Sequence, residues 1–131
     1  MTQPQDRVQL IINYLLLRPA ITEITGQDRI VGGLNLPQGY NPSQGGLVLI
    51  TKRGGPRGRG TAPIIKPGIW TRCYGPTDIA ASHLDRLVIR ELDGAPIGAG
   101  RIVLETDSQP SQQEDTGWPF VLSIFRLTTT F

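Results

Sequence analysis

The segment from Gly68 to Gly94, GIWTRCYGPTDIAASHLDRLVIRELDG, is the feature that most constrains how this chain folds. Residues 69–74 are rich in β-branched and aromatic side chains, which favour a strand. Gly75-Pro76 breaks that strand, and Thr77 is placed to cap a helix that Asp93-Gly94 would end. The segment therefore predicts a strand, a tight turn and a helix in succession.

The expected helix has an apolar stripe that it cannot bury alone. Residues at i, i+4 spacing line this stripe, with Leu87 beside them: Ala80, Leu84, Val88 and Leu92. We expect the stripe to lie on a sheet, whose nearest available member is the strand before the helix. The polar side and end of the helix, with Asp85, Glu91 and Asp93, are expected to face solvent.

Further elements follow from hydrophobic periodicity and from chain-breaking residues. Val8 to Leu17 follow helical spacing and are apolar nearly all round, which indicates burial by more than one neighbour. Pro19 to Thr25 is expected to form a short helical turn. Extended segments or strands are expected at residues 29–31, 47–51, 101–106 and 118–130, with a polar loop at 107–117.

The chain has 131 residues and is expected to be one α+β domain, residues 1–131, with helices packed on one face of an antiparallel, mixed-order sheet. The strands at 69–74 and 118–130 carry apolar side chains on both faces, and one helix layer covers only one of them. The other face needs a second layer or a partner, so we expect an oligomer. The candidate interface residues are Leu10, Tyr14, Trp70, Tyr74 and Ile89.

Charge is unevenly distributed, with a basic middle and an acidic C-terminal part. A glycine- and proline-rich extension at residues 52–67 carries the candidate basic-loop residues Lys52, Arg53, Arg57, Arg59 and Lys66. It lacks the GxxxxGK[ST] pattern of a phosphate loop, and no aromatic residue is interleaved with its arginines to stack on bases. Two interpretations stay open: a sequence-independent contact with a polyanion such as nucleic acid, and a basic surface loop.

The residue types that carry most catalytic and metal chemistry are scarce. His83 is the only histidine and Cys73 the only cysteine, which excludes an internal disulfide and a zinc site built from cysteines. We expect Cys73 to be a small buried apolar residue and His83 to be structural or solvent-facing, and we expect no enzyme activity, metal or cofactor. No apolar run approaches the roughly 20 residues of a membrane span, and residues 1–7 show no secretion signal, so a reducing, cytoplasmic environment is expected.

The order of elements and several short motifs resemble the small tail-completion, or tail-terminator, proteins of long-tailed bacteriophages. The matching pieces, in chain order, are the helix at Val8–Leu17, RPAITEITGQDRIVGG, LNLPQG, LVLIT, GIWTRCYGPT, DIAASHLDRLVIRELDG and FVLSIFRLTTT. The turn that follows Cys73-Tyr74 fits the pattern of this family, whereas the basic extension departs from it.

This resemblance implies a subunit that assembles into a ring, typically a hexamer, in the neck of the virion. The ring would cap the tail tube, join it to the head-to-tail connector proteins and let the genome pass. The basic loop would then face the lumen, the DNA or a partner, and the particle would be assembled in the host cytoplasm. The resemblance implies no cofactor and no catalytic residue.

Two other functions remain open on the sequence alone. The first is another component of the head-to-tail connector, such as an adaptor or a stopper. The second is a small nucleic-acid-binding module that uses Arg53, Arg57 and Arg59 to contact phosphates without regard to sequence.

Overall fold

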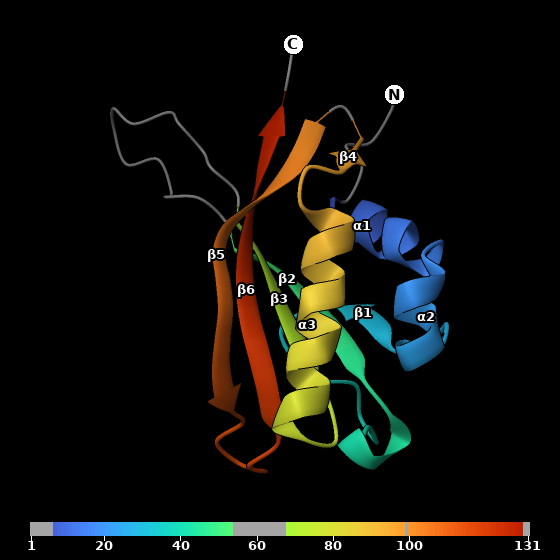
Figure 1. Ribbon diagram of the computed structural model, residues 1–131, viewed down its shortest axis with the longest axis vertical. Helices are drawn as coiled ribbons and strands as arrows, with labels where there is room; N and C mark the ends of the chain where they lie inside the picture. The colour runs from blue at the N-terminus through green and yellow to red at the C-terminus, as the bar shows by residue number, and fades with distance from the viewer. Residues whose placement is uncertain (1–6, 54–67, 99, 130–131) are drawn as a thin grey trace.

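The computed structural model describes residues 7–53, 68–98 and 100–129, which form three α-helices and one sheet (Figure 1). The helices are α1 (Arg7–Leu16), α2 (Pro19–Thr25) and α3 (Asp78–Leu92), with a short 3₁₀ turn η1 at Pro42–Gln44. The strands are β1 (Ile30–Gly32), β2 (Leu47–Arg53), β3 (Gly68–Tyr74), β4 (Pro96–Ile97), β5 (Gly100–Gln112) and β6 (Pro119–Thr129). None of the described helices is long and apolar enough to span a membrane.

The fold is α+β, as expected, and its strands have the order β1-β2-β3-β6-β5-β4. All neighbouring strands are antiparallel, as expected, except β1 and β2, which are parallel and make the sheet mixed. The reason lies in the connection at residues 33–46. It crosses the face of the sheet opposite the helices, where Leu36 and Tyr40 pack, and returns the chain in its original direction.

The three helices lie on the same side of the sheet, where the larger core forms (Figure 1). Helix α3 packs along β3, β5 and β6, while α1 lies on β1 and β2. Leu84, Val88 and Leu92 of α3 are fully buried, which confirms this part of the predicted stripe. Ile89 was expected among the polar residues of α3, but it is half-buried and packs against the same core.

The local sequence explains why α3 begins at Asp78. The hydroxyl of Thr77 accepts a hydrogen bond from the backbone N–H of Ala80 at 3.1 Å, and Asp78 places a carboxylate at the positive end of the helix dipole. Gly75, which follows β3 two residues before Thr77, is buried against this first turn. A Cβ there would lie 2.8 Å from the backbone nitrogen of Ala81, so only glycine allows the strand and the helix to approach this closely.

Strand β5 is longer than the sequence predicts, because residues 107–112 belong to it rather than to a loop. Its pairing with β6 continues after two shifts of register, between Leu104 and Thr106 and between Thr106 and Gln109. Ser108 lies in the second shift and has a positive φ of 30°. The polar composition of this segment gives little strand signal, so its conformation depends on pairing with β6.

We expect Thr77→Ala to lower the free energy of unfolding by about 1 kcal/mol, because the N–H of Ala80 loses its acceptor. Thr77→Ser keeps the hydroxyl and should retain most of the stability. Urea unfolding followed by far-ultraviolet circular dichroism measures both. Equal stability of the alanine and serine variants would show that the cap contributes nothing.

Candidate interaction surface

The sheet face opposite the helices is built from rows of side chains that cross the strands. Each row takes one residue from β2, one from β3 and one from β6, in that order. The three rows are Leu47-Tyr74-Phe120, Leu49-Arg72-Leu122 and Thr51-Trp70-Ile124. Because side chains alternate along a strand, the members of each row point to the same face. This face therefore carries apolar residues on three adjacent strands, of which the sequence predicts β3 and β6.

The chain itself covers the first of these rows. Tyr40, Leu47, Leu49 and Tyr74 form a second buried cluster on this face, with Trp118 and Phe120 packed against it. The ring of Tyr40 meets the ring of Tyr74 edge-on at 6.4 Å between centroids, and that of Trp118 at 5.8 Å. The phenol of Tyr74 donates a hydrogen bond to Gln113 Oε1 at 2.8 Å.

The prediction that Tyr74 carries surface in need of a partner is therefore wrong. Its side chain is 0% exposed within its own chain. The sequence signal was misleading because Tyr74 is covered by Tyr40 and Trp118, which both lie far from it along the chain.

Farther along the same face, the side chains are only partly covered by the described residues. Trp70, Leu122 and Ile124 are half-buried, and they belong to neither core cluster. Arg72 lies among them, with its guanidinium 5.8 Å from the ring centroid of Phe120. We call Trp70, Arg72, Leu122 and Ile124 the open face. It is an apolar surface with one cation among its side chains, which is the composition of a protein contact surface.

The other predicted interface residues do not lie on the open face. Leu10, Tyr14 and Ile89 are half-buried on the helix side of the sheet, packed against the larger core. Tyr14 also accepts a hydrogen bond at 2.7 Å from Arg18, whose guanidinium lies 4.4 Å from the Tyr14 ring centroid. The structure thus places Trp70 alone, of the five predicted residues, on the open face.

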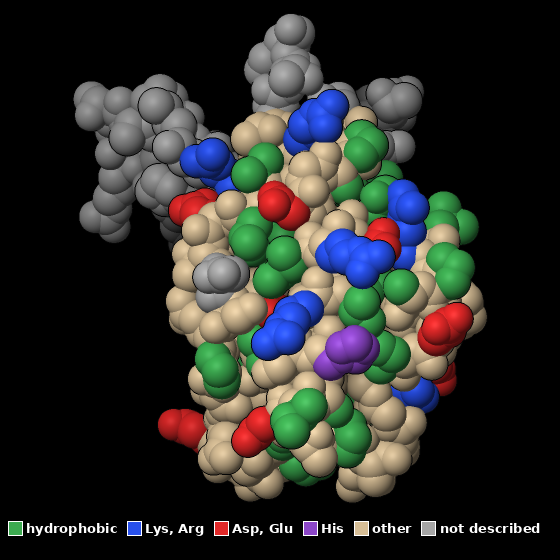
Figure 2. All heavy atoms as spheres, viewed as in Figure 1, with side chains coloured by type: hydrophobic (Ala, Val, Ile, Leu, Met, Phe, Trp, Pro, Cys, Tyr) green, Lys and Arg blue, Asp and Glu red, His purple; other side chains and the backbone are tan. Residues whose placement is uncertain are grey.

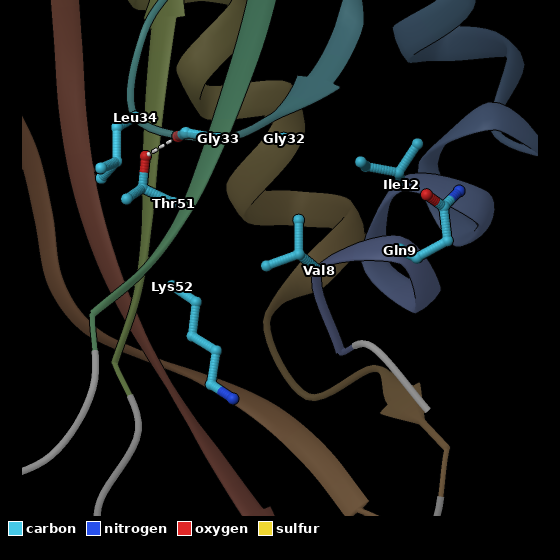
Figure 3. Close-up of a pocket in the computed structure, with 8 residues that line it drawn as sticks. All are labelled: Val8, Gln9, Ile12, Gly32, Gly33, Leu34, Thr51 and Lys52. Atoms are coloured by element: carbon cyan, nitrogen blue, oxygen red, sulfur yellow. Dashed lines mark hydrogen bonds between the residues drawn. The ribbon is translucent and has the colours of Figure 1, made fainter. Parts of the chain in front are cut away.

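Of the predicted basic-loop residues, Arg57, Arg59 and Lys66 lie outside the described residues. Arg53 ends β2, and Lys52 is exposed on the helix side of that strand. Lys52 lines a groove of about 470 Å³ between α1 and the end of the sheet (Figure 3). The other lining residues are Val8, Gln9, Ile12, Gly32, Gly33, Leu34 and Thr51.

The outer side of α3 forms a second exposed surface, which we call the α3 face: Ile79, His83, Arg86 and Arg90. All four side chains are exposed, and Ile79 is 82% exposed although it is a large apolar residue. Figure 2 shows cationic side chains and the histidine gathered over this helix. A shallow hollow of about 310 Å³ lies at its N-terminal half, lined by Asp78, Ile79, Ser82, His83 and Arg86.

Asp85 is the largest departure from the sequence prediction, because it is fully buried rather than solvated. Ser108 Oγ of β5 donates to Asp85 Oδ2 at 2.6 Å, and Ser123 Oγ of β6 donates to Asp85 Oδ1 at 2.7 Å. The backbone N–H of Ser108 donates to Ser123 Oγ at 3.1 Å. The sequence held a signal for this position, since Asp85 lies four residues after Ala81 and three before Val88, both buried.

This arrangement works as a structural clamp. The carboxylate accepts a hydrogen bond from each serine hydroxyl, so it holds both hydroxyls in place. The neighbouring thiol of Cys73 is fully buried, and burial first and the negative charge of Asp85 second raise its pKa well above 9.0. A thiol that stays protonated is a poor nucleophile, which agrees with the structural role expected for Cys73.

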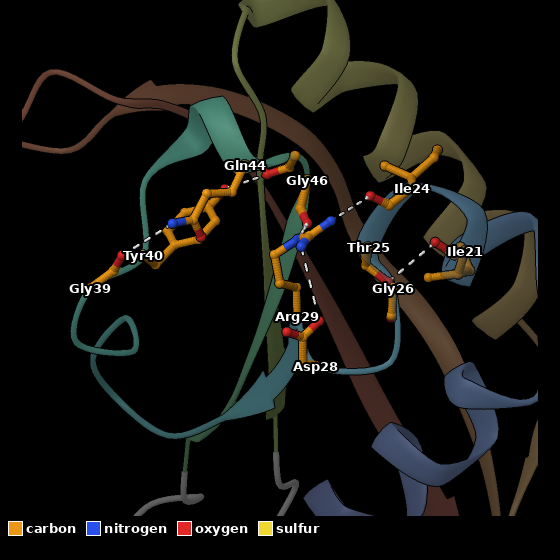
Figure 4. Close-up of polar contacts among 11 residues, drawn as sticks. Ile21, Ile24, Thr25, Gly26, Asp28, Arg29, Gly39, Tyr40, Gln44 and Gly46 are labelled. Atoms are coloured by element: carbon orange, nitrogen blue, oxygen red, sulfur yellow. Dashed lines mark hydrogen bonds and ion pairs between the residues drawn. The ribbon is translucent and has the colours of Figure 1, made fainter.

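Arg29 links the helix layer to the connection that crosses the other face (Figure 4). Its Nε donates to the carbonyl of Gly46 at 3.0 Å and its Nη2 to the carbonyl of Ile24 at 3.3 Å, while Nη1 lies 3.9 Å from Asp28 Oδ1. The Tyr40 phenol donates to the Gly45 carbonyl at 2.8 Å. Burial is the main cause that raises the pKa of Tyr40 to about 12. The sequence predicts none of these contacts.

No protein-family model matches the chain, and no characterised protein matches it in sequence. Among the residues that the structure describes, no three His, Cys, Asp or Glu side chains are grouped so as to hold a metal ion.

We expect Asp85→Ala to lower the free energy of unfolding by about 2–4 kcal/mol, because the buried hydroxyl of Ser123 and the hydroxyl of Ser108 lose a charged acceptor. The control is Asp78→Ala on the same helix, where an exposed carboxylate contributes at most about 1 kcal/mol through the helix dipole. Denaturant titration of both variants at neutral pH compares them. Losses of similar size would contradict a clamp at Asp85.

The raised pKa of Cys73 also predicts how stability depends on pH. Above pH 9.0 the unfolded chain loses the thiol proton while the folded chain keeps it, so the stability that the thiol contributes is complete below that pH and falls as the pH rises. Cys73 should resist a thiol reagent at pH 8 until a denaturant is added. Fast labelling of the native protein would contradict the burial of this side chain.

Proposed function

We propose that this chain is a structural subunit of a bacteriophage neck, which assembles into a ring that caps the tail tube and joins it to the head connector. The genome would pass through the ring. The observation that carries the proposal is the open face, an apolar surface on a 14.3 kDa subunit that the described part of its own chain covers only in part. Surfaces of this kind are typical of protein contacts.

Two features support assembly of identical copies. The first is that the apolar residues of the open face lie on the central strands β3 and β6, which form a continuous, firmly paired platform. The second is that the α3 face, on the opposite side of the molecule, exposes Ile79 among cations. Two different surfaces on opposite sides allow head-to-tail contacts, and head-to-tail contacts that close produce a ring.

The proposal places the protein in the virion and gives it the tail tube protein and connector proteins as partners, with sequence-independent contact to DNA as a further property. The resemblance in the order of elements supports this assignment over other ring-forming proteins. An adaptor or a stopper in the same connector has the same structural task. Electron microscopy of particles assembled without the protein separates them, since overlong or unfinished tails indicate a terminator, and filled heads that leak DNA indicate a stopper.

We expect the purified protein to have a light-scattering mass several times 14.3 kDa. The double variant Leu122→Glu/Ile124→Glu should be monomeric, because it places charges in the apolar contact, and it should keep a native circular dichroism spectrum. The control is Leu17→Glu, at an apolar residue that is 80% exposed and lies between α1 and α2, on the helix side of the sheet. A wild-type protein that is monomeric at every concentration and does not bind tail tubes would refute the proposed function.

A further inference from the structure

An acidic turn lies at the end of the sheet that carries the open face. The turn between β5 and β6 carries Glu114 and Asp115, and both side chains are exposed. Two interactions place it beside Tyr74, which lies two residues from Arg72 of the open face on the same side of β3. The Tyr74 phenol donates to Gln113, next to Glu114, and the charge of Asp115 contributes to the raised pKa of Tyr74, after burial as the main cause. The acidic turn and the open face therefore lie on the same side of the sheet, with the covered row of Tyr74 and Phe120 between them.

The α3 face has the complementary charge. Arg86 and Arg90 are exposed on successive turns of α3, with His83 one turn earlier. Glu91 does not neutralise them, because its carboxylate lies 3.6 Å from Arg18 Nε on the flank toward α1. Asp78 lies at the other end of the helix, so the C-terminal half of the α3 face is basic and its N-terminal half carries the exposed Ile79.

We infer that the α3 face of one copy packs on the open face and acidic turn of the next copy. Arg86 and Arg90 would meet Glu114 and Asp115, and Ile79 would reach the apolar part of the open face. This inference rests on the proposed function and adds to it the pair of surfaces that join neighbouring subunits. Because the two surfaces differ and lie on opposite sides of the sheet, the contact is heterologous, which is the geometry that a ring requires.

A second copy explains more of the observations than another occupant of the α3 face. A nucleic acid would use Arg86 and Arg90, but it would gain nothing from the exposed Ile79, and it would be repelled by Asp78 in the same hollow. It would also leave the open face uncovered. A contact between copies uses the apolar residue, the cations and the acidic turn together, and opposite charges on the two sides would fix the orientation of the copies.

The test is an exchange of charges between the two surfaces. The face-reversed variant is Arg86→Glu/Arg90→Glu, and the turn-reversed variant is Glu114→Arg/Asp115→Arg. All four positions are exposed, so both variants should fold, and circular dichroism checks this. In each variant alone, the α3 face and the acidic-turn positions carry charges of the same sign, so neighbouring copies repel each other at every contact. Its subunit dissociation constant should rise roughly 100-fold or more, as measured by light scattering over a concentration series.

Two combinations should restore assembly. An equimolar mixture of the two variants can alternate around a ring, because the acidic α3 face of one meets the basic turn of the other, and the reverse. A single chain that carries all four substitutions should also assemble. The control is Glu23→Arg, a charge reversal at an exposed position on α2, which should leave the mass unchanged. Wild-type assembly should also weaken between about 0.1 and 1 M salt, because screening shortens the range of the charge contacts.

The possible failures are distinguishable. If the wild type assembles and both reversed variants assemble equally well, this inference is wrong while the proposed ring stands. If the face-reversed variant assembles but no longer binds tail tubes or DNA, the α3 face serves that partner, and the inference is again wrong. If the wild type neither assembles nor binds tail tubes, the proposed function itself fails.

Discussion

The bond between Asp85 and the serines of β5 and β6 is the contact on which the outer part of the sheet depends. It ties α3 to the place where β5 shifts register against β6. Because a register shift changes which side chains point to which face, the shift decides what the end of β5 presents beyond Ser108. The same clamp therefore holds the helix layer in place and sets the position of the turn that carries Glu114 and Asp115.

The elements that depend on nearby residues could be predicted from the sequence. The strand, turn and helix from Gly68 to Leu92 follow from β-branched residues, a glycine-proline break, the Thr77 cap and an apolar stripe, all of which act within a few residues. The rest depends on partners that are distant along the chain. Residues 107–112 form a strand because β6 pairs with them, and β1 is parallel to β2 because the connection between them crosses the sheet.

The surfaces were harder to predict than the fold, for a related reason. An apolar pattern on both faces of β3 indicates that both faces need to be covered, but it does not say which residues cover them. Tyr74 and Trp70 alternate with Arg72 on the same strand face and look equivalent in the sequence, yet Tyr40 and Trp118 cover only Tyr74. Asp85 was misplaced because a charged residue in a helix is usually solvated, and its two serine partners lie more than twenty residues away.

The short outer strands of the sheet have a consequence for how copies of this protein meet. The edge strands are short, since β1 has three residues and β4 has two, so the two edges of the sheet offer few free backbone groups that could hydrogen-bond to an added strand. Beyond β4, the margin of β5 is interrupted by its bulges and by Pro110, which has no N–H to donate. Strand-by-strand growth into fibres is thereby discouraged, which is compatible with the assembly through side chains that we propose.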